Sequence, residues 1–370
     1  MKVRYLALFM VMLMLVLGFT VGCGKDADDG SGDQGEAKGE FAPTGKVQGS
    51  VSMGTNATGT GYHAISSGIA SVVSNHTDMK MIVRPTSGPT AWMPLLAEGK
   101  IDFGVPAKME SKWGFESNKE AGYPDTIPNL RLVCRGNKMD VTGLVVRKDS
   151  GIKSSKDLKG KRVGHGYGGA YTASLFSEAY LHSVGLTWDD VVPTPVSDTA
   201  NALDMLQNGE VDAVYGLSVT TPKTAEVHNA VGLRLLNWGD WDPADFDNFP
   251  EDIKKSIEEM VPGYGVQLYE AGTGFIEEPV IGAYYDVTLV CNEALSEATV
   301  YHALKALYEH NDELGEIYAQ LKLWTTDVMF DDAPLCPYHD GAVKFFKEKG
   351  LWNDKAEAKQ KELLSLAETL

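Results

Sequence analysis

Residues 95–105 read Leu-Leu-Ala-Glu-Gly-Lys-Ile-Asp-Phe-Gly-Val, and residues 205–215 read Met-Leu-Gln-Asn-Gly-Glu-Val-Asp-Ala-Val-Tyr. In both stretches the end of an apparent helix is followed by a glycine, an aspartate and a short apolar strand. A glycine at such a position commonly ends a helix in the left-handed conformation. The two stretches are 110 residues apart, and the same offset aligns Gly54 with Gly164 and Gly59 with Gly169. The chain therefore contains one structural plan twice.

Each copy of this plan alternates strands and helices. A strand is expected over 47–53 in the first copy and over 161–163 in the second, and each is followed by a glycine-rich loop and a helix. Further strands are expected over 81–84 and 191–195. This alternation is typical of α/β units on a parallel sheet, and the long offset indicates two similar lobes rather than a solenoid. Two such lobes form a cleft, where a small ligand commonly binds.

Two β-rich runs, 141–148 and 283–292, flank the second copy and are predicted to be hinge strands. Lobe 1 would then comprise 45–140 and 293–370, and lobe 2 would comprise 149–282. The C-terminal part shows the helical spacing of apolar residues. We expect helices over 299–311, 312–323, 341–349 and 356–370.

Asp102 and Asp212 occupy equivalent positions after the glycine in the two copies. A pair of catalytic carboxylates is one interpretation. Their equivalence favours another, in which each carboxylate organises the turn into its own strand.

The two glycine-rich loops, loop one over 54–62 and loop two over 164–172, are the main candidates for binding chemistry. A strand-to-helix turn rich in Gly, Thr and Ser presents backbone N–H groups at a positive helix end, which suits an anion. Gly164, Gly166 and Gly169 also fit the dinucleotide pattern GxGxxG. That reading requires an acid at the end of the next strand, whereas Asp189 and Asp190 precede it.

Composition limits the function classes further. The chain has 370 residues, with 33 Lys and Arg against 51 Asp and Glu, for a net charge of −18. This excess of acid argues against nucleic-acid binding and against broad binding to anionic membranes. It does not exclude an anionic ligand in a cleft, where local dipoles matter more than net charge.

The N-terminus is predicted to be a targeting segment. Lys2 and Arg4 precede a short apolar run that ends in small residues, which is typical of a signal peptide over 1–22. Thr20-Val21-Gly22-Cys23 resembles a lipoprotein cleavage box, so we expect Cys23 to be lipidated. Residues 23–44, with little to bury, would form a flexible tether. The protein is therefore expected to be extracytoplasmic, in the periplasm or at the cell surface, and held to the membrane by a lipid anchor.

Three further cysteines leave two readings open. Cys134 and Cys291 fall in apparent strands and could pair in an exported compartment. Alternatively Cys134, Cys291 and Cys336 are all small buried hydrophobic residues. Their spacing fits no zinc motif.

No sequence pattern indicates an enzyme. HExxH, GxSxG and P-loop motifs are absent from the sequence. A cluster of Asp331, Asp332, His339 and Asp340 could hold a metal, but such a run more often forms a solvated loop. We therefore expect no catalysis, no cofactor and no metal.

Several of these stretches together resemble the solute receptors of the TAXI family, which serve tripartite ATP-independent periplasmic (TRAP) transporters. The resemblance covers about 47–352 and rests on 54–62, 149–152, 157–163, 185–190, 209–214 and 339–350. It implies a type II periplasmic-binding-protein-like fold, with two α/β lobes joined by hinge strands and a ligand in the interlobe cleft. It also implies a monomer that delivers a small organic carboxylate to TRAP membrane subunits driven by an ion gradient. A receptor for an ATP-driven importer or a sensor, and an exported enzyme, are the alternatives.

The resemblance also suggests a set of ligand-binding residues. They are Thr55, Thr58, Gly59, Tyr62, Trp92, Ala107, Gly168, Gly169, Ala170, Tyr171, Tyr215 and Ser218. Residues 168–171 read Gly-Gly-Ala-Tyr where the family commonly has Gly-Ser-Gly-Thr. The Ser and Thr hydroxyls are therefore missing, and only backbone N–H groups remain as donors there. Trp92 and Ala107 stand where relatives commonly have Asn and Gln. With Tyr62, Tyr167 and Tyr171, they suggest a carboxylate ligand with an apolar or aromatic remainder, and Arg84 could contribute a cation.

Overall fold

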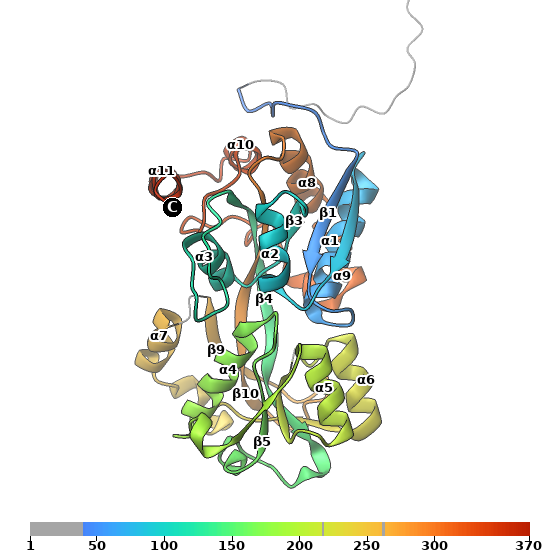
Figure 1. Ribbon diagram of the computed structural model, residues 1–370, viewed down its shortest axis with the longest axis vertical. Helices are drawn as coiled ribbons and strands as arrows, with labels where there is room; N and C mark the ends of the chain where they lie inside the picture. The colour runs from blue at the N-terminus through green and yellow to red at the C-terminus, as the bar shows by residue number, and fades with distance from the viewer. Residues whose placement is uncertain (1–39, 217, 261–262) are drawn as a thin grey trace, which may run out of the picture. The chain divides into compact units, whose positions relative to one another are not determined.

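The computed structural model describes residues 40–216, 218–260 and 263–370, which all belong to one compact unit (Figure 1). The predicted signal peptide, Cys23 and most of the predicted tether lie outside the described residues. Thr44, the last residue of that tether, contacts the folded body, because its N–H donates to the carboxylate of Glu297 at 2.7 Å. Within the described residues, the helices are too short or too polar to cross a bilayer.

The described strands form one long sheet whose order repeats itself. The order is β2-β1-β3-β10-β4-β7-β5-β6, with β8 beside β4 and β9 beside β10. The strands span β1 Ser50–Thr55, β2 Lys80–Pro85, β3 Phe103–Gly104, β4 Leu130–Arg147, β5 Arg162–His165, β6 Val192–Pro195, β7 Ala213–Gly216, β8 Leu233–Leu235, β9 Tyr264–Tyr269 and β10 Val280–Asn292. In each half, a parallel triple is followed by one long antiparallel strand.

The helices follow the same repeat. They span α1 Gly61–His76, α2 Pro89–Ala97, α3 Lys108–Glu116, α4 Tyr171–His182, α5 Thr199–Asn208, α6 Pro222–Val231, α7 Glu251–Met260, α8 Glu297–Glu309, α9 Asn311–Ile317, α10 Asp340–Glu348 and α11 Asp354–Ala367. Within the repeat, α1 and α2 correspond to α4 and α5. The expected α/β fold with two similar halves is confirmed. We call β1–β3, α1–α3 and the C-terminal helices lobe 1, and β5–β8 with α4–α7 lobe 2.

Asp102 and Asp212 show how the repeated stretch builds each lobe. The Ser52 N–H and hydroxyl donate to Asp102 Oδ2 at 2.7 and 2.9 Å, and the Arg162 N–H donates to Asp212 Oδ2 at 2.8 Å. Each carboxylate thus fastens the start of the third strand to the first strand. These contacts agree with the structural role that the sequence favours. Gly209 precedes its aspartate in the left-handed conformation (φ 73°), as expected for a helix end.

Two long strands, β4 and β10, connect the lobes. They pair antiparallel, from Leu130 opposite Asn292 to Thr142 opposite Ala283. From Gly143 onward, β4 pairs instead with β7, a strand of lobe 2. Figure 1 shows both strands passing between the two groups of helices. β4 thus begins well before the predicted hinge segment 141–148, because it is also a strand of the lobe 1 sheet. The exact division into lobes and hinge stays a prediction.

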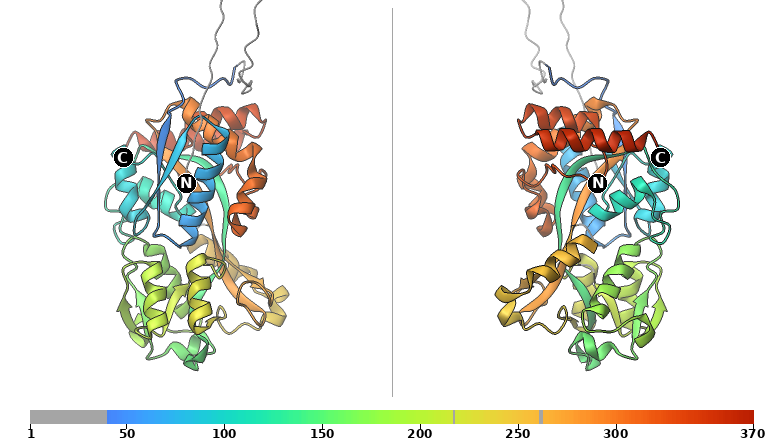
Figure 2. Two further views of the ribbon diagram at one scale, coloured as in Figure 1. Left: turned by 90° about the vertical axis from the view of Figure 1, so that its right-hand side faces the viewer. Right: turned by 90° about the vertical axis from the view of Figure 1, so that its left-hand side faces the viewer.

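The C-terminal helices cover lobe 1, where they appear in red and orange in Figure 2. The expected helices are present, with one difference. The segment 312–323 is not one helix, because α9 ends at Ile317 and a separate 3₁₀ helix, η5, spans Ala319–Leu323. Tyr318 between them is extended (φ −147°, ψ 125°). This break turns the Gln320 side chain inward, where it is buried.

The three described cysteines, Cys134, Cys291 and Cys336, are free and buried, so the interpretation in which Cys134 pairs with Cys291 is wrong. The alternative reading, in which all three are small core residues, is confirmed. Burial raises the pKa of the Cys134 and Cys336 thiols to about 12. They are therefore inert at neutral pH.

Removal of the Asp102 carboxylate tests its structural role. Asp102→Ala leaves the Ser52 N–H and hydroxyl without their acceptor, and charge-assisted hydrogen bonds of this kind contribute about 1.5–3 kcal/mol. We expect urea denaturation to show a loss of this size, and a smaller loss for Asp102→Asn, which keeps one acceptor oxygen. An unchanged unfolding midpoint for Asp102→Ala would contradict the structural role.

Candidate ligand site at the seam between the lobes

The carboxyl ends of the parallel strands meet where the two lobes touch. The segment after β1 reaches the start of α6, since the Lys223 N–H donates to the Gly59 carbonyl at 3.2 Å. The segment after β2 reaches the segment after β5, since the Thr90 N–H donates to the Gly169 carbonyl at 3.3 Å. We call this set of contacts the seam. In open α/β sheets, ligands bind at such carboxyl ends.

Two glycines meet at the seam. A Cβ at Gly169 would lie 2.5 Å from Ser87 Oγ and 2.6 Å from the Gly88 nitrogen, far inside van der Waals contact. Gly88 precedes α2 and Ala170 precedes α4, and neither helix has a side chain that caps its N-terminus. At α2, however, Pro89 has no N–H and the Thr90 N–H already donates to the Gly169 carbonyl. Backbone donors that suit a carboxylate therefore come from the start of α4.

Buried polar atoms surround this place. Thr55 and Asn56, at the end of β1, are 0% and 2% exposed, and their side-chain oxygens have no hydrogen-bond partner among the described residues. Buried polar atoms in proteins are normally paired, so these two are candidates for ligand contacts.

Gln320 is a seam residue that the sequence did not indicate. Its amide nitrogen donates to Ser218 Oγ in lobe 2 and, at 3.0 Å, to the Asp140 carbonyl in β4. Its amide oxygen has no partner among the described residues. The break at Tyr318 places it there, and a continuous helical pattern over 312–323 hid that break.

Glu110 is the second residue that the sequence missed, and it brings an acid to the seam. Its Oε1 accepts a hydrogen bond from the Thr172 hydroxyl of lobe 2 at 3.1 Å, and its Oε2 accepts one from the Ala107 N–H at 2.8 Å. The Tyr123 hydroxyl also faces this carboxyl. Burial raises the pKa of Glu110 to about 7, although these hydrogen bonds oppose the rise. Near neutral pH it is only partly ionised.

Aromatic rings extend from the seam into lobe 2. Tyr62 lies 6.4 Å from Tyr285, and Tyr285 lies 5.0 Å from Phe176, between ring centroids. Tyr171 meets Trp113 of lobe 1 edge-on at 6.2 Å. Full burial raises the pKa of Tyr62 well above its usual value, so its hydroxyl stays protonated. Tyr62, Tyr285 and Phe176 are buried, so a layer of packed rings borders the seam.

The structure brings most of the predicted ligand-binding residues to the seam but not all. Those near the contacts described above are Thr55, Gly59, Tyr62, Ala107, Gly169, Ala170, Tyr171 and Ser218. Thr58 and Gly168 are exposed. Tyr215 lies inside lobe 2, where its hydroxyl donates to Thr142 Oγ1 at 2.6 Å. Which of the predicted residues touch a ligand stays a prediction.

Three aromatic or charged residues lie elsewhere than the sequence suggested. The Trp92 ring covers Gly54 and Gly104, where added Cβ atoms would lie 2.8 and 2.4 Å from it, so it fills the core of lobe 1. Tyr167 is fully buried in lobe 2, and its hydroxyl accepts the Tyr215 N–H at 2.7 Å. Arg84 is exposed and donates to the Lys100 carbonyl at 3.3 Å.

Asp331, Asp332 and His339, which were the less favoured candidates for a metal site, have separate partners. Asp331 forms an ion pair with Lys108 at 2.8 Å, while Asp332 pairs with Lys355 at 2.9 Å. The His339 ring caps α10 and faces the Leu295 carbonyl at 3.1 Å. These contacts are those of structural side chains.

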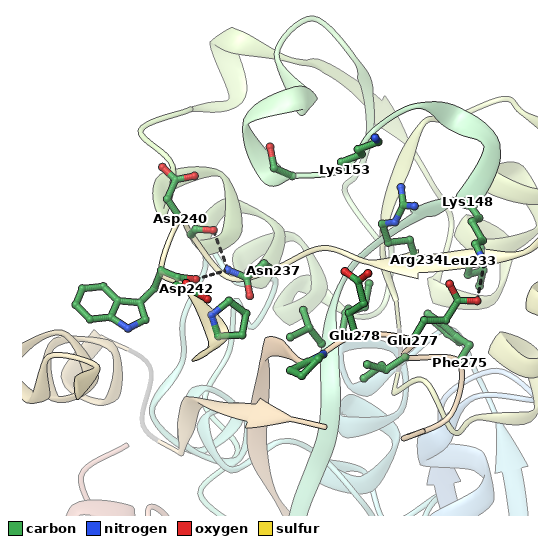
Figure 3. Close-up of a pocket in the computed structure, with 18 residues that line it drawn as sticks. Lys148, Lys153, Leu233, Arg234, Asn237, Asp240, Asp242, Phe275, Glu277 and Glu278 are labelled. Carbon is green, nitrogen blue, oxygen red and sulfur yellow. Dashed lines mark hydrogen bonds and ion pairs between the residues drawn. The ribbon is translucent and has the colours of Figure 1, made fainter. Parts of the chain in front are cut away.

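A separate cavity of about 690 Å³ opens on lobe 2 (Figure 3). None of the predicted ligand-binding residues lines it. Its rim carries both signs of charge, and Lys148 pairs with Glu277 across it at 2.5 Å. None of the buried polar side-chain atoms without a partner among the described residues belongs to its lining, so it carries less evidence than the seam.

A methyl group at the closest contact tests whether the seam is a movable interface. Gly169→Ala places a Cβ against the backbone of residues 87–88 in the other lobe, so we expect the lobes to separate while each stays folded. Hydrogen exchange of the Thr90 amide, which donates across the seam, should accelerate. Gly49→Ala, whose Cβ would meet nothing within 4 Å, is the control. Equal exchange in the two variants would contradict a movable seam.

Glu110 gives the fold a pH dependence of known sign. Its pKa rises from about 4.5 when unfolded to about 7 when folded, so its contribution to stability is complete below pH 4.5 and is lost as pH rises to 7. The loss is about 3 kcal/mol. Urea denaturation at pH 5 and pH 7 should therefore show a steeper fall for the natural chain than for Glu110→Gln. Parallel pH profiles would disprove this role.

Comparison with known proteins agrees with the fold. The periplasmic binding protein BugD is 12% identical, with a TM-score of 0.52, over 86% of this chain and 97% of that chain. The alkanesulfonate-binding protein SsuA from Xanthomonas axonopodis pv. citri, bound to MOPS, is 15% identical with a TM-score of 0.46, over 87% of this chain and 99% of that chain. The fold that this chain shares with BugD is that of a periplasmic binding protein.

Sequence relatives match more locally. The 4-amino-5-hydroxymethyl-2-methylpyrimidine phosphate synthase of Schizosaccharomyces pombe is 30% identical over 136 residues, or 37% of this chain and 35% of that protein. The synthase of the same name from Legionella pneumophila is 28% identical over 151 residues, or 38% of this chain and 45% of that protein. The matches thus span less than half the length of these curated relatives. The model of the NMT1-like family, in contrast, matches residues 53–350, and the chain therefore belongs to the NMT1-like family.

Proposed function

We propose that this chain is an extracytoplasmic solute receptor that captures a small organic carboxylate between its lobes. The observation that carries the proposal is that buried side-chain oxygens of Thr55, Asn56 and Gln320 without partners lie in lobe 1, across the seam from the start of α4, which has no side-chain cap. Each lobe supplies part of one anion site, so the site is complete only when the lobes are closed. The fold shared with BugD and the membership in the NMT1-like family support this reading.

Backbone N–H groups, rather than a cation, would hold the carboxylate. The Lys223 ammonium, close to loop one, already pairs with Asp204 at 2.7 Å and Glu226 at 2.8 Å. Arg84 is exposed on lobe 1. Helix-terminal donors act without a charged side chain because the helix dipole favours an anion at that end.

Closure then follows from differential affinity. Ligand contacts from both lobes exist only in the closed arrangement, so the ligand shifts the equilibrium toward it by the energy of those extra contacts. β4 and β10 are the strands that would bend. The oxygens of Thr55, Asn56 and Gln320 would orient the ligand, and the rings of Tyr62 and Tyr285 would cover its apolar or aromatic remainder.

We also propose which type of transport system the receptor serves. Its resemblance to TAXI receptors favours delivery to TRAP membrane subunits, with the receptor a monomer anchored through a lipid on Cys23. An ATP-driven importer or a sensor would use the same closure. We propose no catalysis, and the local likeness to pyrimidine phosphate synthases makes an enzyme the alternative to test.

Calorimetry with matched probes tests the ligand class. We expect the full-length protein to bind phenylacetate or 4-methyl-2-oxopentanoate, and to bind phenylacetamide about tenfold or more weakly than phenylacetate, a difference of about 1.4 kcal/mol. The amide keeps the ring but removes the negative charge. Analysis of the acids after incubation should recover them unchanged.

Two outcomes would contradict the proposal in different ways. Tight binding of glutamate, with no binding of either apolar acid, would exclude the apolar or aromatic remainder but keep a receptor. Conversion of a bound acid into a product would replace the receptor with an enzyme.

A further inference from the structure

Three side chains with metal-binding atoms meet on lobe 1, far from the seam. His76 is the last residue of α1, whose first residues face the seam, and a helix of 16 residues is about 24 Å long. His310 ends α8, and Glu313 lies in the first turn of α9. The cluster thus joins helices that are far apart in the sequence.

The three groups converge closely. His76 Nε2 lies 2.9 Å from a carboxylate oxygen of Glu313, and His310 Nδ1 lies 3.5 Å from the same oxygen. One nitrogen of each ring and one oxygen all lie within 4.8 Å of one another. Among the described residues, this is the one group of three or more such side chains that is so close.

The two imidazole rings are stacked, with centroids 3.5 Å apart and planes 10° from parallel. A neutral imidazole ring has one nitrogen whose lone pair can bind a metal ion, and the two rings bring two such nitrogens to one carboxylate. A simple ion pair between one protonated histidine and Glu313 is the alternative explanation. Because both rings approach Glu313, the two explanations differ in whether the chain binds a metal ion.

Two imidazoles and one carboxylate form a donor set that binds Zn²⁺ in many proteins, with water as a fourth ligand. The side chains of His76, His310 and Glu313 are 25%, 38% and 41% exposed, which leaves access for an ion and a water. To bind one ion, a lone pair from each ring must point at it, so the two stacked rings must tilt relative to each other. The partial exposure of both rings permits this tilt. The net charge of −18 also favours cations.

We propose that His76, His310 and Glu313 bind a divalent transition-metal ion, with Zn²⁺ as the best match, and that the ion ties α1 to the junction of α8 and α9. This site is independent of the solute proposed above. Because the ion binds the folded chain, it raises the thermal stability of lobe 1. Acid weakens binding, because the ligands must be unprotonated.

Zinc titration of the full chain, without a histidine tag, tests this site. We expect calorimetry to show one tight Zn²⁺ per chain and the melting temperature to rise with Zn²⁺. His76→Gln and His310→Gln should each weaken binding by more than about tenfold, the lower limit for losing even an outer partner of a metal ligand. His182→Gln is the matched control, because His182 faces Glu178 at 3.8 Å as a simple histidine–glutamate pair.

The outcomes separate the site from both misfolding and adventitious binding. Each variant should keep a cooperative melting transition without zinc, which shows that it folds. Absence of zinc binding in the natural chain would overturn the proposal, as would an equal loss in the His182→Gln control. Full zinc affinity in His76→Gln or His310→Gln would also overturn it and leave the simple ion pair.

Discussion

The close contact between the lobes at Gly169 and the backbone of residues 87–88 leaves no room for a side chain. The start of α2 and the start of α4 therefore come close enough for the Thr90 N–H to reach the Gly169 carbonyl. Everything proposed for function depends on this proximity. It places the start of α4 opposite the buried polar oxygens of lobe 1, so the proposed site is complete only when the lobes are closed.

Much of this arrangement follows from the sequence because it rests on local, repeated patterns. The glycine and aspartate of the duplicated stretch predicted equivalent turns, and Asp102 and Asp212 make equivalent contacts in the two lobes. The strand–loop–helix order predicted which loops follow the carboxyl ends of strands. The residues that the sequence missed, Glu110 and Gln320, depend on contacts between distant segments. No periodicity marks a glutamate that meets a threonine from the other lobe.

For aromatic residues, the sequence did not predict which rings lie at the seam and which fill the core of a lobe. Tyr62 and Tyr171, in the glycine-rich loops, and Trp92, where family relatives commonly have Asn, were all predicted to line the ligand site. In the structure Trp92 covers two glycines of its own lobe, whereas Tyr62 and Tyr171 lie next to rings from other elements. The cysteines teach the same lesson, since Cys134 and Cys291 lie in neighbouring strands but are free and buried. Strand assignment alone does not fix where a side chain points.

Glu110 changes the electrostatic picture of the seam. The sequence predicted an anion site, and the start of α4, which has no side-chain cap, supports one, yet a buried carboxyl lies beside it. Its raised pKa allows it to be protonated near neutral pH and to coexist with a bound acid. Native mass spectrometry of the gently purified full-length protein tests whether the seam holds a carboxylate. We expect an intact small organic acid bound to the natural chain and lost from Gly169→Ala. An equal amount of bound acid in both proteins, or a bound reaction product or cofactor, would contradict it.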